Sequence, residues 1–176
     1  MLPVRFGYTT GLGSTAMIVI LMGVTGAGKT TVGEALAGQL HWRFADADSY
    51  HSVANVEKMR SGIPLTDADR EPWLTSLHTA IVGWIATGEN VVLACSALKA
   101  AYRERLLVSP EVKLVYLKAD RELVAQRLAG RQHHYMNPSL IESQFETLQP
   151  PQGAVTVDGS LPTDAVVEDI RRRLAV

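Results

Sequence analysis

The segment from Gly23 to Thr31, GVTGAGKTT, fits the phosphate-loop pattern G-x-x-x-x-G-K-[ST] and directly follows an apolar run. Glycines let such a loop turn tightly, so that backbone N–H groups converge on phosphate oxygens near the positive end of the next helix. The pattern predicts that Lys29 reaches the β- and γ-phosphates and that the Thr30 hydroxyl ligates Mg²⁺. The residues expected to hold the nucleotide are Gly23, Thr25, Gly26, Ala27, Gly28, Lys29, Thr30 and Thr31.

Two carboxylates, Asp46 and Asp48, follow the second predicted strand. Side chains two positions apart in an extended segment point the same way, and open α/β sheets bind ligands at the carboxyl ends of their strands. Phosphoryl transfer to an alcohol needs a metal to neutralise phosphate charge and a base to deprotonate the hydroxyl. One carboxylate can therefore face Mg²⁺ while the other meets an acceptor hydroxyl. A solvated acidic loop is the alternative interpretation.

The features of phosphate-loop motors and switches are missing. The long hydrophobic strand predicted at Val91–Cys95 ends without an acid to hold Mg²⁺, and no D-x-x-G sequence occurs. A partial guanine-binding pattern, K-x-D at Lys118–Asp120, has Leu117 where an asparagine is expected. Asp120 is more simply explained as a helix N-cap. The sequence therefore favours a small-molecule kinase over a motor or a switch.

The elements around these residues alternate between short β-branched runs and longer helical patterns, which is typical of an α/β protein with a parallel sheet. Strands are predicted at Ile18–Met22, Trp42–Ala45, Val91–Cys95, Lys113–Leu117 and Ala154–Val157. Helices are predicted at Lys29–Leu40, Val53–Arg60, Ala68–Thr87, Leu98–Val108, Arg121–Gly130, Ser139–Phe145 and Thr163–Leu174. We expect a loose N-terminal extension over residues 1–16 and a single domain over residues 17–176.

Composition limits the possible partners and location. The 176 residues are 47% apolar and 20% charged, with a net charge of −1, which gives no general basic field for nucleic acid. No run approaches the roughly 20 apolar residues that span a bilayer, so no membrane partner is expected. The single cysteine, Cys95, cannot form an internal disulfide, which favours a reducing compartment. A cytoplasmic location is the expectation.

Three longer motifs point to one family. The stretches Asp46–Leu74, Cys95–Leu106 and Gln144–Pro151 contain K-M-x-x-G-x-P-L-x-D-x-D-R-x-P-W-L, S-A-L-K-x-x-Y-R and QFETLQPP. With the phosphate loop, they resemble the gluconate kinase family of phosphate-loop kinases, in the same order. The resemblance implies transfer of the ATP γ-phosphate to the 6-hydroxyl of D-gluconate, with ATP and Mg²⁺. It also implies a three-layer, nucleoside-monophosphate-kinase-like fold with a five-stranded parallel sheet and a mobile lid, and a homodimer.

The same resemblance suggests roles at the predicted acceptor site. It makes Asp48 the catalytic base or ligand of the acceptor hydroxyl and assigns Asp46 to the Mg²⁺ shell. His51, three residues after Asp48, would offer a neutral hydrogen-bonding group to a polyol, although a loop histidine with a structural role is an alternative.

Gluconate also needs a cation for its carboxylate, and four basic residues are candidates. Arg60 and Arg70 flank the turn over residues 61–69, and a guanidinium can bind a carboxylate through two parallel hydrogen bonds. Lys99 and Arg103 are spaced i, i+4, which is one face of a helix. A solvated basic surface is the alternative for both pairs.

A lid is expected over about residues 127–138. It contains Arg127 and Arg131, which would stabilise charge on the transferring phosphoryl group when the lid excludes water. The family pattern R-x-G-H-F is altered by His133 and Tyr135, and Ser52 stands where the family often has proline.

Other functions stay open at this point. They are a kinase for another small hydroxy acid, such as a shikimate-like acceptor, a nucleoside monophosphate kinase, and a nucleotide-binding regulatory module.

Overall fold

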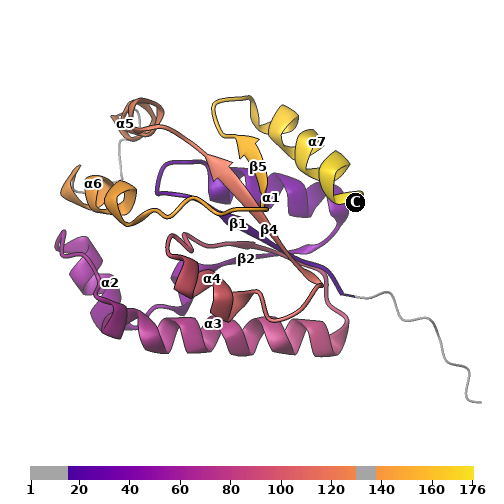
Figure 1. Cartoon of the computed structure of the whole chain (residues 1–176), viewed down its shortest axis with the longest axis horizontal. Coiled ribbons are helices and arrows are strands. Elements are labelled where there is room, and N and C mark those ends of the chain that lie inside the picture. The colour runs from indigo at the N-terminus through magenta and orange to yellow at the C-terminus, as the bar shows by residue number, and fades with distance from the viewer. Residues whose placement is uncertain (1–15, 130–137) are drawn as a thin grey trace, which may run out of the picture.

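A five-stranded parallel sheet forms the centre of the protein in a computed structural model, which describes residues 16–129 and 138–176 (Figure 1). The strands are β1 (Ile18–Met22), β2 (Arg43–Asp46), β3 (Val91–Ala94), β4 (Val112–Lys118) and β5 (Val155–Asp158). Their order in the sheet is β2-β3-β1-β4-β5. All five residues of β1 are buried, as expected for a central strand covered on both faces.

Helices cover both faces of the sheet, which makes three layers. They are α1 (Lys29–Leu40), α2 (Val53–Arg60), α3 (Asp67–Thr87), α4 (Ala100–Leu106), α5 (Arg121–Ala129), α6 (Pro138–Thr147) and α7 (Thr163–Leu174), with a short 3₁₀ turn, η1 (Ala47–Tyr50), after β2. In Figure 1, α3 and α4 lie below the sheet, α7 lies above it, and α2, α5 and α6 lie toward one end. No helix of the described residues is long and apolar enough to cross a membrane.

Two hydrophobic cores hold these layers together. On one face, Trp73, Leu77 and Ile81 of α3 pack with the buried side chains of β1 and β3. On the other face, Leu36 of α1 and Ile170 of α7 pack with the alternate residues of the same strands and of β4. Because all strands are parallel, both cores fix the carboxyl ends of the strands at one edge, where a ligand site is expected.

Three of the helices near that edge, α2, α3 and α5, begin at side-chain caps. Thr66 and Asp69 form a reciprocal capping box at the start of α3. Ser52, where the related family often has proline, caps α2 by accepting a hydrogen bond from the Asn55 backbone at 3.2 Å. Asp120 caps α5 by accepting one from the Leu123 backbone at 2.8 Å, which accounts for the K-x-D sequence.

The predicted fold class is confirmed, with small differences at element boundaries. One of them lies after β3, where α4 begins at Ala100 instead of Leu98. Ala97 adopts a left-handed φ of 42°, so the chain turns before the helix can start. The predicted extension lies outside the described residues up to position 15, as do most of the predicted lid and its residues Arg131, His133 and Tyr135.

Candidate active site

A cleft of about 420 Å³ opens where the strands end. Its floor is the phosphate loop with the residues that follow β2 and β3, and its walls come from the α2–α3 connection, α3, α4 and α6. Of the predicted site residues, the cleft lining contains Thr25, Gly26, Gly28, Lys29, Thr30, Thr31, Asp46, Asp48, His51 and Arg70. The structure thus brings together residues that are up to 45 positions apart in the sequence.

The phosphate loop has the expected backbone. Gly26 and Gly28 have φ values of 80° and 105°, which residues with a Cβ rarely adopt. Gly28 directly precedes α1, so the open N-terminus of that helix faces the cleft. The Lys29 ammonium donates to the Val24 carbonyl at 2.9 Å, and burial lowers the pKa of this lysine.

Asp46 links the second strand to the loop. Its Oδ2 accepts a hydrogen bond of 3.5 Å from the Thr30 hydroxyl, and its Oδ1 accepts one of 2.9 Å from the Asp48 backbone. Asp48 therefore sits at a fixed position beside Asp46. The Asp48 side chain is open to the cleft, but the cleft walls partly desolvate its carboxyl group. This desolvation raises the pKa of Asp48, and the charge of Asp46 raises it further.

The chemistry of this corner fits Mg²⁺. A hydroxyl and a carboxylate are hard oxygen ligands, and protein Mg²⁺ is usually held by one or two carboxylates together with substrate phosphates. No group of three or more His, Cys, Asp or Glu side chains suited to a metal occurs among residues 16–129 and 138–176. Thr30 and Asp46 are thus suited to a metal that arrives with a nucleotide.

His51 lies flat against Trp73 in the wall of the cleft. The ring centroids are 4.7 Å apart with an interplanar angle of 6°, and the Trp73 Nε1 donates to the Ala47 carbonyl at 2.7 Å. Burial lowers the pKa of His51, which favours the neutral ring. Its Nδ1 atom is buried and has no hydrogen-bond partner among the described residues. Trp73 is both buried and part of the cleft wall.

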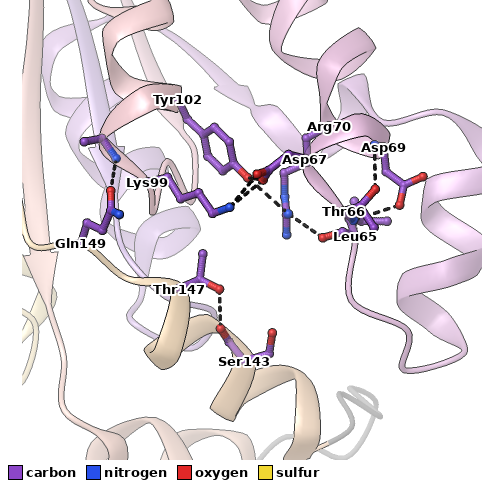
Figure 2. A network of polar contacts seen from close by, with 11 residues as sticks. Leu65, Thr66, Asp67, Asp69, Arg70, Lys99, Tyr102, Ser143, Thr147 and Gln149 are labelled. Carbon is purple, nitrogen blue, oxygen red and sulfur yellow. Dashed lines mark hydrogen bonds and ion pairs between the residues drawn. The ribbon is translucent and has the colours of Figure 1, made fainter.

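At the other end of the cleft, Arg70 and Tyr102 face the cavity across from α6 (Figure 2). Arg70 donates to the Leu65 carbonyl at 2.6 Å and to the Tyr102 hydroxyl at 3.4 Å. The Tyr102 hydroxyl in turn donates to Asp67, which also pairs with the Lys99 ammonium at 2.7 Å. Hydrogen bonds from Lys99 and Tyr102 lower the pKa of Asp67. Lys99, predicted to meet the substrate, thus pairs with Asp67 outside the cleft lining.

Two other predicted basic residues also lie outside the cleft lining. Arg103 is buried, and its guanidinium donates to the carbonyls of Ala97 and Leu98 at 3.0 and 2.9 Å. It therefore supports the turn after β3 from behind. Arg60 is exposed at the end of α2.

Arg127 lies behind the phosphate loop. Its guanidinium donates to the Ala27 carbonyl at 2.8 Å and to the Gly159 carbonyl at 2.6 Å. It borders a second cavity of about 230 Å³, whose lining is Ala27, Gly28, Thr31, Val32, Arg127, Gly159, Leu161, Thr163 and Val166.

Several residues of the site were not predicted as such. Tyr102 stands within the S-A-L-K-x-x-Y-R motif, so its position was available as a signal. Gln144 of α6 lines the cleft and bonds to the phosphate loop. At Gly159, the signal in the sequence is only the glycine itself. A Cβ there would lie 2.7 Å from the Lys118 carbonyl oxygen, so only glycine fits without displacement. The phosphate-loop motif covers Ala27, Gly28 and Thr31 of the second cavity, but no motif marks its far side at Leu161, Thr163 and Val166.

Together, the sheet order, the phosphate loop and the paired aspartates define a phosphate-loop kinase domain. The AAA domain family model matches residues 18–151. A gluconokinase of Gluconobacter oxydans is 40% identical over 169 residues, covering 94% of this chain and 95% of that protein. The chain belongs to the gluconokinase family, as the sequence motifs predicted.

Solved structures of related kinases have the same fold. A gluconokinase from Sinorhizobium meliloti superposes with a TM-score of 0.81 at 38% identity, covering 92% of this chain and 93% of that one. A sugar kinase from Janibacter sp. gives a TM-score of 0.86 at 35% identity, covering 92% and 95%. Similarity at this level does not favour the shikimate-like, nucleoside monophosphate or regulatory alternatives.

Proposed function

We propose that the protein transfers the γ-phosphoryl group of ATP to the 6-hydroxyl of D-gluconate, giving ADP and 6-phospho-D-gluconate. The observation that carries the proposal is one cleft in which Lys29, Thr30 and Asp46 lie beside Asp48, with Arg70 at the opposite end. Family membership supports gluconate as the acceptor.

At the phosphate end of the cleft, different groups would bind the metal and the phosphate oxygens. Bound MgATP supplies a γ-phosphoryl group whose charge the metal partly neutralises. Thr30 and Asp46 would hold the metal, because their oxygen atoms converge at 3.5 Å. Lys29 and the backbone N–H groups of the loop would bind phosphate oxygens.

Asp48 would act on the acceptor. Its carboxylate would accept the proton of the gluconate hydroxyl while the new O–P bond forms and the bond to the β-phosphate oxygen breaks. Surroundings that raise the pKa of Asp48 make it a stronger base than an ordinary aspartate, which suits this role.

The opposite end of the cleft suits a linear polyhydroxy acid. The Arg70 guanidinium can bind the carboxylate, and the Tyr102 hydroxyl lies beside it. The His51 ring lines the cleft, and Ser143 and Thr147 of α6 line the facing wall (Figure 2). We propose these groups as the gluconate ligands, with the predicted Arg70 and the neighbouring Tyr102, and not Lys99 or Arg103, at the carboxylate.

The second cavity is our candidate for the nucleobase. It adjoins the first turn of α1 through Gly28 and Thr31, which also line the main cleft. A nucleotide with its base between Arg127 and Leu161 would therefore lead its phosphates directly to the loop.

A coupled assay of ADP release with a panel of acceptors tests the function. We expect release that requires both gluconate and Mg²⁺, and no comparable turnover with shikimate or nucleoside monophosphates. The Asp48→Asn variant is the control that should lack activity. Turnover of another acceptor without activity on gluconate would remove the substrate assignment.

A homodimer and a cytoplasmic location are further proposals, supported by the family resemblance and by the lone buried Cys95. Light scattering after size exclusion tests the dimer, and imaging of the tagged protein in its cell tests the location.

A further inference from the structure

Gln144 of α6 makes two hydrogen bonds with Thr25, the third residue of the phosphate loop. Its Oε1 accepts from the Thr25 backbone N–H at 2.7 Å, and its Nε2 donates to the Thr25 hydroxyl at 2.8 Å. The residues are 119 positions apart, and both line the main cleft. α6 and the phosphate loop are thus joined at the nucleotide end of the cleft.

Chemistry fixes the direction of both bonds. A backbone N–H can only donate, so the Gln144 atom that faces it must be the carbonyl oxygen. The other atom is then the amide nitrogen, which can only donate, so the Thr25 hydroxyl is an acceptor in this bond. Since a hydroxyl also carries one proton, Thr25 keeps that proton for a further partner in the cleft.

The position of Thr25 indicates which partner it could meet. Gly28 and Thr31 line both cavities, whereas Thr25 lines only the main cleft, as Asp48 does. A nucleotide with its base in the second cavity would pass Gly28 with its phosphates and end near Thr25. The last phosphate, the one to be transferred, would then lie closest to the Thr25 hydroxyl.

The loop is also fixed from its other side. Arg127 of α5 donates to the carbonyls of Gly26 and Ala27 at 3.4 and 2.8 Å. A Cβ at Gly26 would lie 3.1 Å from Val124, so the loop packs tightly on α5. With α5 behind the loop and Gln144 in front, Thr25 has little freedom to choose another orientation.

We propose that Gln144 is a positioning residue that turns the Thr25 hydroxyl proton toward the terminal phosphate of the bound nucleotide. The inference rests on the proposed use of ATP, but not on gluconate as the acceptor. A hydrogen bond from a hydroxyl to a charged phosphate oxygen is stronger than one between neutral groups. Gln144 therefore favours the triphosphate over the diphosphate.

Gln144→Glu is the sharpest test. A carboxylate at this position accepts from both the Thr25 N–H and the hydroxyl, which turns the proton away from the phosphate and adds a negative charge nearby. We expect the affinity for MgATP to fall about tenfold or more, with a smaller fall for MgADP. Thr25→Val, which removes the hydroxyl, should show the same selective loss, while Thr25→Ser should retain wild-type affinity.

Isothermal titration calorimetry without any acceptor measures these affinities. Glu146→Gln, at an exposed position of the same helix, is the control and should bind both nucleotides as the wild type does. Circular dichroism melts identify any variant that fails to fold, and Thr25→Val carries the test if Gln144→Glu is one of them.

The inference is overturned if Thr25→Val binds MgATP and MgADP like the wild type. It is also overturned if the losses from Thr25→Val and Gln144→Glu multiply in the double variant, because a shared interaction can be lost only once. The failure of wild-type protein to phosphorylate gluconate, with the nucleotide selectivity of the variants intact, would remove the acceptor assignment and leave this inference standing.

Discussion

Thr30 Oγ1 lies 3.5 Å from Asp46 Oδ2, which joins the first turn of α1 to the last residue of β2. The pair stands at the corner between the phosphate loop and Asp48. Both atoms are hard oxygen ligands, so a change at either one should act on the metal before it acts on the acceptor.

Asp46→Asn keeps the size of the side chain and removes its charge. We expect the Mg²⁺ concentration for half-maximal activity to rise about tenfold or more, with little change in the KM for gluconate. Titration of activity with Mg²⁺ at saturating ATP measures this. Glu168→Gln, exposed on α7, is the charge-matched control. A rise in the gluconate KM alone would instead make Asp46 a substrate ligand.

The pKa of Asp48 predicts a pH dependence. Partial desolvation by the cleft walls and the charge of Asp46 raise this pKa, and the proposed base must be ionised to accept a proton. Activity should therefore be lost as pH falls, with a midpoint in kcat/KM above the ordinary aspartate value of about 3.9. The residual activity of Asp46→Asn should have its midpoint at lower pH, because one cause of the raised pKa is gone.

The replacement Asp48→Asn should remove the acid-side titration together with the activity. We expect kcat to fall by about 10²- to 10⁴-fold while MgATP binding is retained. Steady-state kinetics and nucleotide titration on the same preparation separate the two effects. Unchanged kcat would exclude Asp48 as the base.

Tyr102 should affect the binding of gluconate and not the binding of ATP. Tyr102→Phe removes the hydroxyl that lies between Arg70 and Asp67, so Arg70 loses a neighbour at the end of the cleft. We expect the KM for gluconate to rise about tenfold with the KM for ATP unchanged. Tyr116→Phe, at a buried position of β4 outside the cleft lining, is the control. Equal rises in both KM values would contradict a specific role at the acid end.

Most of the sequence-predicted residues that line the cleft have a geometry set by their immediate neighbours. The phosphate loop and the Asp46–Asp48 pair depend on a strand end, a glycine turn and a helix start, all of which leave local patterns. The same holds for the central strands β1 and β3, whose β-branched runs are buried on both faces. Gln144 meets Thr25 across 119 positions, and no local pattern can report such a contact.

Lys99 and Arg103 illustrate why the remaining site residues were not predictable. Their i, i+4 spacing predicts one helical face, but Lys99 has extended backbone angles (φ −89°, ψ 145°) and precedes α4. The cause is the left-handed turn at Ala97, an unfavourable conformation for a residue with a Cβ. An alanine in a sequence gives no sign of such a turn. Tertiary contacts, among them those of Arg103, hold it in place.

Arg103 should therefore matter for stability more than for substrate binding. Arg103→Met keeps the apolar stem and leaves the Ala97 carbonyl without its charged donor, so the free energy of unfolding should fall by about 1.5–3 kcal/mol. Arg105→Met is the matched control: Arg105 forms an exposed pair with Glu71, whose loss should cost about 1 kcal/mol or less. Urea unfolding of the three proteins measures the difference. A raised gluconate KM in Arg103→Met with wild-type stability would contradict the structural role, because a residue that only supports the turn cannot change binding without changing the fold.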